Sequence, residues 1–276
     1  MAKTSIMHNA WAAGHAAVLL GSLSCFLGLL TFTTKTKSYS LAYAGAIVSW
    51  GIVVYKSLGT PQPSKAYIQR ALLDENVQYL LLAVYWFLQK PIIVTLIPFA
   101  TFSLFHTLTF LRTSVLPKAP SAPSGKNAPS SQVPLGPGAK LSKAIQVWVK
   151  ANYEKAMLFV AFVEVGVVFG RLLLGGITFQ NSLLSPLFFA HFLRLRFYLS
   201  PPTRQAFGVF NAQLDKHVVL NQKVPEGVRK GVKMARELIA RYSESIISVS
   251  QPGAAGAAGA GAAGGRAAAA EQHRAR

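Results

Sequence analysis

Twenty consecutive uncharged residues, Ile92 to Leu111, constrain this chain more than any other feature of its sequence. A bilayer core of ~30 Å takes about 20 apolar residues in helical form, because inside hydrocarbon each backbone amide must bond within its own helix. The run follows Gln89-Lys90-Pro91, and Val77 to Leu88 before that break is also apolar. The stretch from Ser64 to Arg112 is therefore predicted to be a helical hairpin embedded in a membrane.

The sequence leaves undecided whether the first arm of this hairpin is long enough to cross the membrane. Val77 to Leu88 contains only twelve residues, too few for a straight crossing. Either the arm borrows Tyr67 to Asn76 to reach the length of a crossing, or it penetrates only part of the bilayer.

Composition extends the membrane assignment to most of the chain. Hydrophobic residues make up 51% of the 276 residues and charged residues 13%, which is typical of a polytopic all-α membrane protein rather than a soluble domain. The formal net charge of +19 could indicate nucleic-acid binding, but the sequence contains no basic stripe interleaved with aromatic residues. Cytoplasmic loops that face anionic headgroups explain this charge better, so nucleic acid is not an expected partner.

Four further apolar runs are predicted to be membrane helices: Ala10–Phe32, Tyr39–Tyr55, Met157–Phe179 and Leu183–Leu199. In the first run small residues recur at spacings of four and three, which places them on one helical face that allows close approach of a second helix. Alanine-rich composition alone is the alternative explanation. The small residues are Ala10, Gly14, Ala17, Gly21, Ser24 and Gly28 in the first run, and Ala42, Gly45 and Ser49 in the second.

The order of apolar and polar stretches divides the chain into six regions. Residues 117–140 contain six prolines and no aromatic residue, so a disordered linker is expected there, and the Ala/Gly-rich tail is also expected to be disordered. Leu141 to Lys155 is expected to form a short basic approach helix. The regions are an N-terminal transmembrane hairpin (1–60), a central transmembrane hairpin (61–116), the linker (117–140), a second membrane module (141–200), cytoplasmic amphipathic helices (201–250) and the tail (251–276).

Lysine and arginine counts favour one orientation in the membrane. If the six apolar segments form three hairpins with both termini cytoplasmic, only Lys35, Lys37 and Lys90 fall on the lumenal side. The opposite orientation would place most of the positive charge in the lumen. Both termini are therefore expected in the cytoplasm, and five or fewer full crossings stay possible because the 77–88 arm is short.

Polar side chains that interrupt the apolar runs include His106, Glu164, Arg171, His191 and Arg194. Charges at membrane depth are costly and are therefore candidates for function. Glu164 and Arg171 lie seven residues apart, about 10 Å along a helix axis, so each is expected to pair with a neighbouring helix. His106 is expected to be a packing residue, and Arg194 and Arg196 are expected to reach the headgroups. The alternative is an ion or proton path through a small channel or transporter that uses Glu164, Arg171 and His191.

Beyond Ser200-Pro201-Pro202 the chain is predicted to form two amphipathic helices. Such helices can lie in the headgroup plane with an apolar stripe among the acyl chains, attracted by anionic lipid and sensitive to curvature. Docking on another protein and covering the protein's own membrane bundle are the alternatives. The expected membrane-binding residues are Phe207, Phe210, Leu214, Val218, Val228, Val232, Ile239, Tyr242 and Ile246, and the basic face of the second helix is Arg229, Lys230, Lys233, Arg236 and Arg241.

Catalytic constellations are missing from the sequence. It contains no phosphate-binding glycine loop, no G-x-S-x-G or H-E-x-x-H motif and no carboxylate pair placed for acid and base roles. The single cysteine, Cys25, excludes an internal disulfide framework. We therefore expect no enzymatic activity, no metal and no cofactor.

Several short patches occur in a characteristic order. They are Ser64, Ala66, Ala71 to Glu75, Tyr79 to Leu81, Pro91, Pro98, Ser103, Leu104 and His106 in the central hairpin, then Phe192 to Arg196, Tyr198, Pro202, Phe210 and Asn211. In this order the chain resembles the transmembrane protein 33 family, whose fungal members are pore-membrane nucleoporins. The resemblance covers most of residues 10–250 and departs at the proline-rich linker and the tail.

The resemblance implies a multi-spanning protein of the endoplasmic reticulum (ER) and nuclear envelope that associates with nuclear pore complexes and supports their assembly and distribution. It implies a lipid bilayer, nuclear pore subunits, a karyopherin and reticulon-type proteins as partners. By position, amphipathic membrane binding and karyopherin contact would fall on the Phe207 and Val228 stripes with Arg229, Lys230 and Lys233. The alternatives are a general ER-shaping protein or stress-signalling adaptor, and the small channel or transporter named above.

Overall fold

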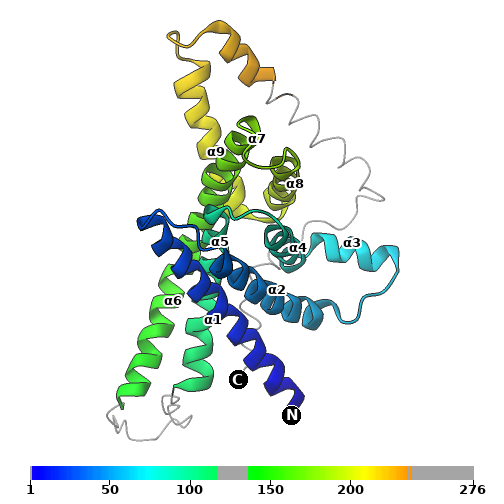
Figure 1. The fold of residues 1–276 in the computed structure, drawn as a ribbon, viewed down its shortest axis with the longest axis vertical. Helices are drawn as coiled ribbons and strands as arrows, with labels where there is room; N and C mark the ends of the chain where they lie inside the picture. Colours follow the sequence, from blue (N-terminus) through cyan, green and yellow to red (C-terminus); the bar gives the residue numbers. More distant parts are fainter. Residues whose placement is uncertain (1, 117–135, 235–236, 238–276) are drawn as a thin grey trace, which may run out of the picture. The chain divides into compact units, whose positions relative to one another are not determined.

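The computed structural model describes residues 2–116, 136–234 and 237, and every regular element within these ranges is helical (Figure 1). This confirms the predicted all-α class. The chain divides into two compact units, residues 1–186 and 187–276, which are described separately below. The predictions of disorder for residues 117–135 and 251–276 lie outside the described residues.

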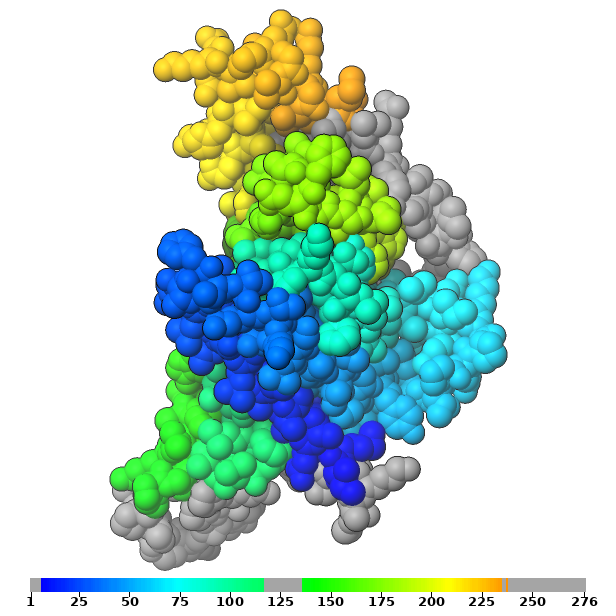
Figure 2. Space-filling model, in the orientation of Figure 1, coloured from blue at the N-terminus to red at the C-terminus, as the bar shows by residue number. Residues whose placement is uncertain are grey.

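The helices α1 (Ala2–Leu30) and α2 (Thr36–Leu58) form an antiparallel hairpin and contact each other along their length (Figure 1 and Figure 2). A Cβ atom placed on Gly21 would lie 2.5 Å from the carbonyl oxygen of Ser38, and one on Gly45 would lie 2.5 Å from the carbonyl oxygen of Gly14. Only glycine fits at contacts this close. The predicted small-residue interface between the first two apolar runs is confirmed.

The first arm of the central hairpin is broken at Asp74. There α3 (Lys65–Leu73) ends and α4 (Glu75–Leu88) begins, because the Asp74 carboxylate accepts hydrogen bonds from the backbone amides of Asn76 and Val77 at 2.8 and 3.2 Å. The 14 residues of α4 span about 21 Å, less than the ~30 Å core of a bilayer. Of the two arrangements that the sequence leaves open, the break favours partial penetration.

The second arm begins after Pro91 with a 3₁₀ turn (Ile93–Thr95) and continues as α5 (Leu96–Phe110) and a π-helical segment (Leu111–Val115). The hydroxyl of Thr95 lies 2.7 Å from that of Tyr43 and 3.2 Å from that of Tyr39, both on α2. All three side chains are buried. Because α5 also packs on α1, these contacts join α1, α2 and α5 into one group.

A single helix of 41 residues follows the linker. It consists of α6 (Pro137–Phe162), a π-helical segment (Val163–Val168) and α7 (Phe169–Ile177). The expected linker end at Lys140 is wrong, since the helix begins at Pro137, a residue type that suits the first helical turn. The expected approach helix is not a separate element either, because Leu141 to Lys155 continues directly into the apolar run.

Four helices in the described residues are long and apolar enough to cross a membrane: Ile6–Leu30, Thr36–Leu58, Ile93–Val115 and Pro137–Ile177. The other two expected apolar segments lie in α4 and in α8 (Leu184–Leu199), with 14 and 16 residues. These two helices are shorter than the ~20 residues that a straight crossing takes. Four of the six expected segments therefore qualify as spans.

The second unit contains a sharp helical corner between α8, most of which belongs to it, and α9 (Pro201–Leu214). Arg204 of α9 donates hydrogen bonds to the carbonyl oxygens of Phe197 and Tyr198 at 3.3 and 2.9 Å. These carbonyls belong to the last turn of α8, where backbone carbonyl oxygens have no amide donor within the helix. A π-helical segment (Asp215–Val219) extends α9, and residues 226–234 are also helical.

Candidate functional site

The predicted membrane-binding stripe of α9 is used in two ways. Phe207 packs edge-on against Phe197 of α8, with ring centroids 5.5 Å apart. Leu214, two turns further on, is 41% exposed, while Phe210 and Val218 are half-buried. The N-terminal end of the stripe thus covers its own unit, and the C-terminal end presents apolar surface that a membrane or a protein could cover.

The second predicted amphipathic helix is described over its first turns only. Lys230 Nζ lies 2.8 Å from the Glu226 carboxylate one turn earlier, an exposed ion pair worth well under 1 kcal/mol. Among the predicted residues here, Val228, Lys230 and Lys233 are exposed, whereas Arg229 and Val232 are half-buried. The predicted residues Arg236, Ile239, Arg241, Tyr242 and Ile246 lie outside the described residues.

Glu164 is the most deeply buried of the predicted intramembrane polar residues, with 1% of its surface exposed. Its carboxylate accepts a hydrogen bond from the Tyr79 hydroxyl of α4 at 2.6 Å. The Tyr79 ring packs edge-on against Phe99 and Phe102 of α5, with centroids 5.8 and 5.0 Å away. This hydrogen bond joins α4 to the long helix, at a π-helical segment of the kind often found at functional sites.

Arg171 makes a local contact instead of an interhelical one. Its Nη2 atom donates to the Gln180 Oε1 atom at 3.0 Å, in the turn that follows its own helix. Glu164 and Arg171 therefore bind different partners. The seven-residue spacing between them could not show whether each partner lies on another helix or in a nearby turn.

His106 belongs to an aromatic cluster in the first unit. Its ring stacks on that of His15 at 4.6 Å and meets Trp11 edge-on at 5.3 Å, both on α1. His15 is 1% exposed, and its Nδ1 atom lies 2.9 Å from the Ser103 hydroxyl of α5. The geometry places His106 among packing residues, as expected, and adds His15, which the sequence analysis missed although it is also polar and lies in an apolar run.

The polar residues of α8 differ in exposure. His191 is exposed and Arg194 is half-buried, but Arg196 is only 6% exposed. The expectation that Arg196 reaches the headgroups is therefore wrong. The reason is helical periodicity, because Arg196 follows the buried Phe189 and Phe192 at spacings of seven and four and so lies on their face.

Within the described ranges, no group of three or more His, Cys, Asp or Glu side chains is placed to hold a metal ion. What the arrangement offers is a packed helical group joined by hydroxyl contacts, and an α9 stripe whose far end is exposed. The hydroxyls of Tyr79, Thr95 and Ser103 carry these contacts. From the sequence, Tyr79 and Ser103 were named only for the family resemblance, and Thr95 was not named.

Comparison with known proteins identifies relatives across nearly the whole chain. The sequence profile of the family described as Transmembrane protein 33/Nucleoporin POM33 matches residues 1–245. A Chaetomium thermophilum relative named Nucleoporin POM33 is 32% identical over 226 residues, 76% of this chain and 77% of the relative. Tetra-spanning protein 1 of Schizosaccharomyces pombe is 27% identical over 248 residues, covering 87% and 86% of the two chains.

Animal relatives are more distant, and human Transmembrane protein 33 is 24% identical over 226 residues, 80% of this chain and 83% of the relative. No solved structure matches the chain significantly. The family profile nevertheless extends from residue 1 to residue 245, within the predicted amphipathic region. This chain belongs to the Transmembrane protein 33/Nucleoporin POM33 family.

Proposed function

We propose that this protein is a non-enzymatic membrane protein of the ER and nuclear envelope that associates with nuclear pore complexes and supports their assembly and distribution. Family membership carries this proposal, since one fungal relative is named Nucleoporin POM33 and another, from Saccharomyces cerevisiae, is named Pore membrane protein of 33 kDa. The latter is 25% identical over 261 residues, 90% of this chain and 88% of the relative.

The proposed topology has four crossings with both termini in the cytoplasm. Four described helices are long and apolar enough, and the name of the Schizosaccharomyces pombe relative agrees with that number. An even number of crossings keeps the two termini on one side. Lys35 and Lys37 in the α1–α2 turn then lie in the lumen, on the opposite side of the membrane from the N-terminus.

The proposed mechanism is wedge insertion into the cytoplasmic leaflet. The 14-residue α4 is too short to cross, and the far end of the α9 stripe, at Leu214 and Val218, can enter the headgroup region. Both elements would occupy more area in one leaflet than in the other and so favour curved membrane. The basic residues Arg229, Lys230 and Lys233 would provide the face for anionic lipid or for a karyopherin, and reticulon-type proteins would act on the same curved membrane.

The test is the location of a tagged full-length copy, expressed at its native level and imaged beside a pore marker. The pore role predicts puncta at the nuclear rim that coincide with the marker. Leu214→Glu combined with Val218→Glu should disperse them, because both charges fall on the apolar stripe. Gln205→Glu is the matched control, since Gln205 is exposed on the opposite face of α9 and should leave the puncta unchanged.

Uniform ER signal from the wild-type protein would contradict the pore role and favour general ER shaping or adaptor work. The channel alternative makes a separate prediction, namely an ion or proton flux in proteoliposomes that Glu164→Gln abolishes. The contacts favour a structural role for this carboxylate, because Tyr79 donates to Glu164 while Arg171 binds Gln180.

A further inference from the structure

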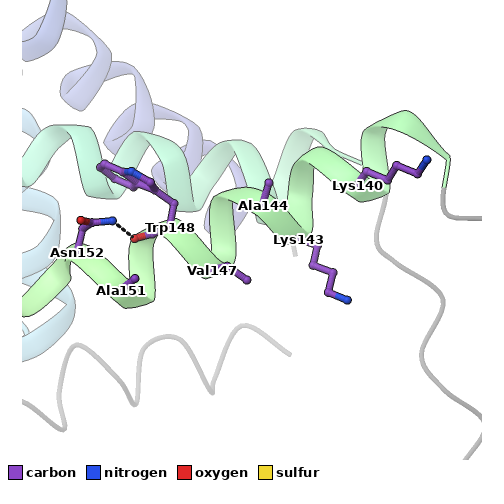
Figure 3. Close-up of a pocket in the computed structure, with 7 residues that line it drawn as sticks. All are labelled: Lys140, Lys143, Ala144, Val147, Trp148, Ala151 and Asn152. Carbon is purple, nitrogen blue, oxygen red and sulfur yellow. Dashed lines mark hydrogen bonds between the residues drawn. The ribbon is translucent and has the colours of Figure 1, made fainter.

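A shallow groove of about 600 Å³ runs along the N-terminal half of α6, outside every site described so far. Figure 3 shows Lys140 and Lys143 near the start of the helix and Trp148 with Asn152 further along it. The residues that line the groove are Lys140, Lys143, Ala144, Val147, Trp148, Ala151 and Asn152. The groove therefore has a cationic end and an apolar end on one helix.

The groove lies beside the face of α6 that packs on α5. Ile145 and Val149 are buried on that face and pack with Phe105 of α5. In contrast, Val147 is 61% exposed and Trp148 is 45% exposed, and both lysines are exposed. Asn152 Nδ2 donates to the carbonyl oxygen of Trp148 at 2.8 Å, so this amide nitrogen is bonded within the helix.

The position of the groove relative to the membrane follows from the contact between α6 and α5. The Phe105 ring stacks on Trp148 at 5.5 Å, so the N-terminal half of α6 runs antiparallel to the C-terminal half of α5. The uncharged run of α5 ends at Leu111, and Arg112 follows. Lys140 and Lys143 precede Trp148 and therefore lie toward that same charged end of the hairpin, at the level where a span leaves the hydrocarbon.

The length of the long helix supports the same position of the groove near the membrane surface. Its 41 residues span about 60 Å, roughly twice the ~30 Å core of a bilayer. All its lysines lie in the first half, at positions 140, 143, 150 and 155. Part of the lysine-bearing half must therefore extend beyond the hydrocarbon to the membrane surface, where tryptophan and lysine are both favoured.

We propose that this groove binds an anionic phospholipid of the adjoining leaflet. The ammonium groups of Lys140 and Lys143 would bind the phosphate and the anionic headgroup, since each is a compact point charge with three donors. Val147 and Trp148 would contact the upper acyl chains about 8 Å further along the helix axis. The order of these residues along the helix, cationic first and apolar second, matches the order of headgroup and chain in a lipid.

The test measures quenching of tryptophan fluorescence in the full-length protein, reconstituted in phosphatidylcholine nanodiscs. Brominated phosphatidylserine or brominated phosphatidylcholine is added at equal mole fraction. Trp148 is the most exposed of the four tryptophans, so it dominates the quenching. With two lysines at ~1 kcal/mol each, phosphatidylserine should be preferred about 30-fold in the groove, and added salt should reduce that preference.

Lys140→Gln combined with Lys143→Gln should abolish the preference for phosphatidylserine and leave quenching by phosphatidylcholine unchanged, which also shows that the variant is folded. Lys35→Gln combined with Lys37→Gln is the matched control, because it removes the same charge from the α1–α2 turn, which does not line the groove, and should keep the preference. Equal quenching by both lipids in the wild-type protein would refute the proposal. So would a response of Trp148 to soluble polyglutamate without a response to phosphatidylserine, which would assign the groove to an acidic protein segment.

Discussion

The close contact of α1 with α2 predicts that one methyl group at Gly21 separates the two helices. In Gly21→Ala the new Cβ atom would lie 2.5 Å from the Ser38 carbonyl oxygen and 2.9 Å from the Ala42 Cβ atom. Carbon atoms in good contact are about 3.5–4.0 Å apart. The obstacle includes backbone of α2, which no rotamer change can remove, so the helices must move apart locally by about 1 Å.

The size of the effect follows from comparison with a second glycine. At Gly51 on α2, a new Cβ atom meets nothing within 4 Å. Alanine gains about 0.8–1.0 kcal/mol over glycine in a helix interior, and this gain is shared by both variants. Overpacking costs about 1–3 kcal/mol and applies to Gly21→Ala alone. The opening equilibrium of the hairpin should therefore be about fivefold to 140-fold larger in Gly21→Ala than in Gly51→Ala.

The single cysteine of the chain reports this opening directly. Cys25 lies one turn beyond Gly21 on α1, is 1% exposed, and has its Sγ atom 3.6 Å from the Lys35 carbonyl oxygen. When opening and closing are faster than reaction, the rate of maleimide labelling in detergent is proportional to the open population. Separation of the helices should also stretch the hydrogen bond between the Ser24 and Ser38 hydroxyls, now 2.8 Å long.

Cys25 should thus react about fivefold to 140-fold faster in Gly21→Ala than in Gly51→Ala, and the bulkier Gly21→Ile should enlarge the difference. Equal rates in the two alanine variants would refute the reasoning. They would mean that the helices relax around the methyl group without a change in their association.

Three further contacts make quantitative predictions. Tyr79→Phe removes the hydroxyl that donates to Glu164 and should lower the free energy of unfolding in mixed micelles by about 1–3 kcal/mol, whereas Glu164→Gln keeps an acceptor oxygen and should cost less. Thr95→Val removes a hydroxyl that Tyr43 contacts and should also cost about 1–3 kcal/mol, with Thr95→Ser as the control that retains it. Asp74→Ala should weaken the start of α4 by about 0.5–2 kcal/mol, seen as faster amide hydrogen exchange in its first turn, and Asp74→Asn should restore most of the protection.

Local periodicity explains how much of the fold the sequence could predict. The spacing of Gly14 and Gly21 against Gly45 identified the α1–α2 interface, because small residues on one helical face have few other uses in lipid. The break at Asp74 was harder to predict from the sequence. Its capping role depends on the extended backbone at that residue, while the surrounding sequence is compatible with one continuous helix.

Hydropathy located the long helix but not its ends. The apolar run at Met157–Phe179 suggested a boundary near Lys155, yet backbone hydrogen bonds continue through polar residues as readily as through apolar ones. The basic half is amphipathic with the same period, since Ile145 and Val149 lie on one buried face. The change in polarity near Lys155 therefore did not mark the start of a new element.

Partners distant in sequence could not be predicted at all. Burial of Glu164 was expected to require a donor, but 85 residues separate it from Tyr79, and nothing in a periodic pattern specifies that pairing. The contact has a consequence for the proposed lipid groove, because Glu164 and Trp148 lie on one continuous helix about 24 Å apart. Fixing the carboxylate against α4 fixes the axial position of the helix, and with it the depth of Lys140 and Lys143. The buried hydrogen bond and the proposed lipid groove thus lie on one continuous helix, and under this proposal the first helps to set the depth of the second in the headgroup layer.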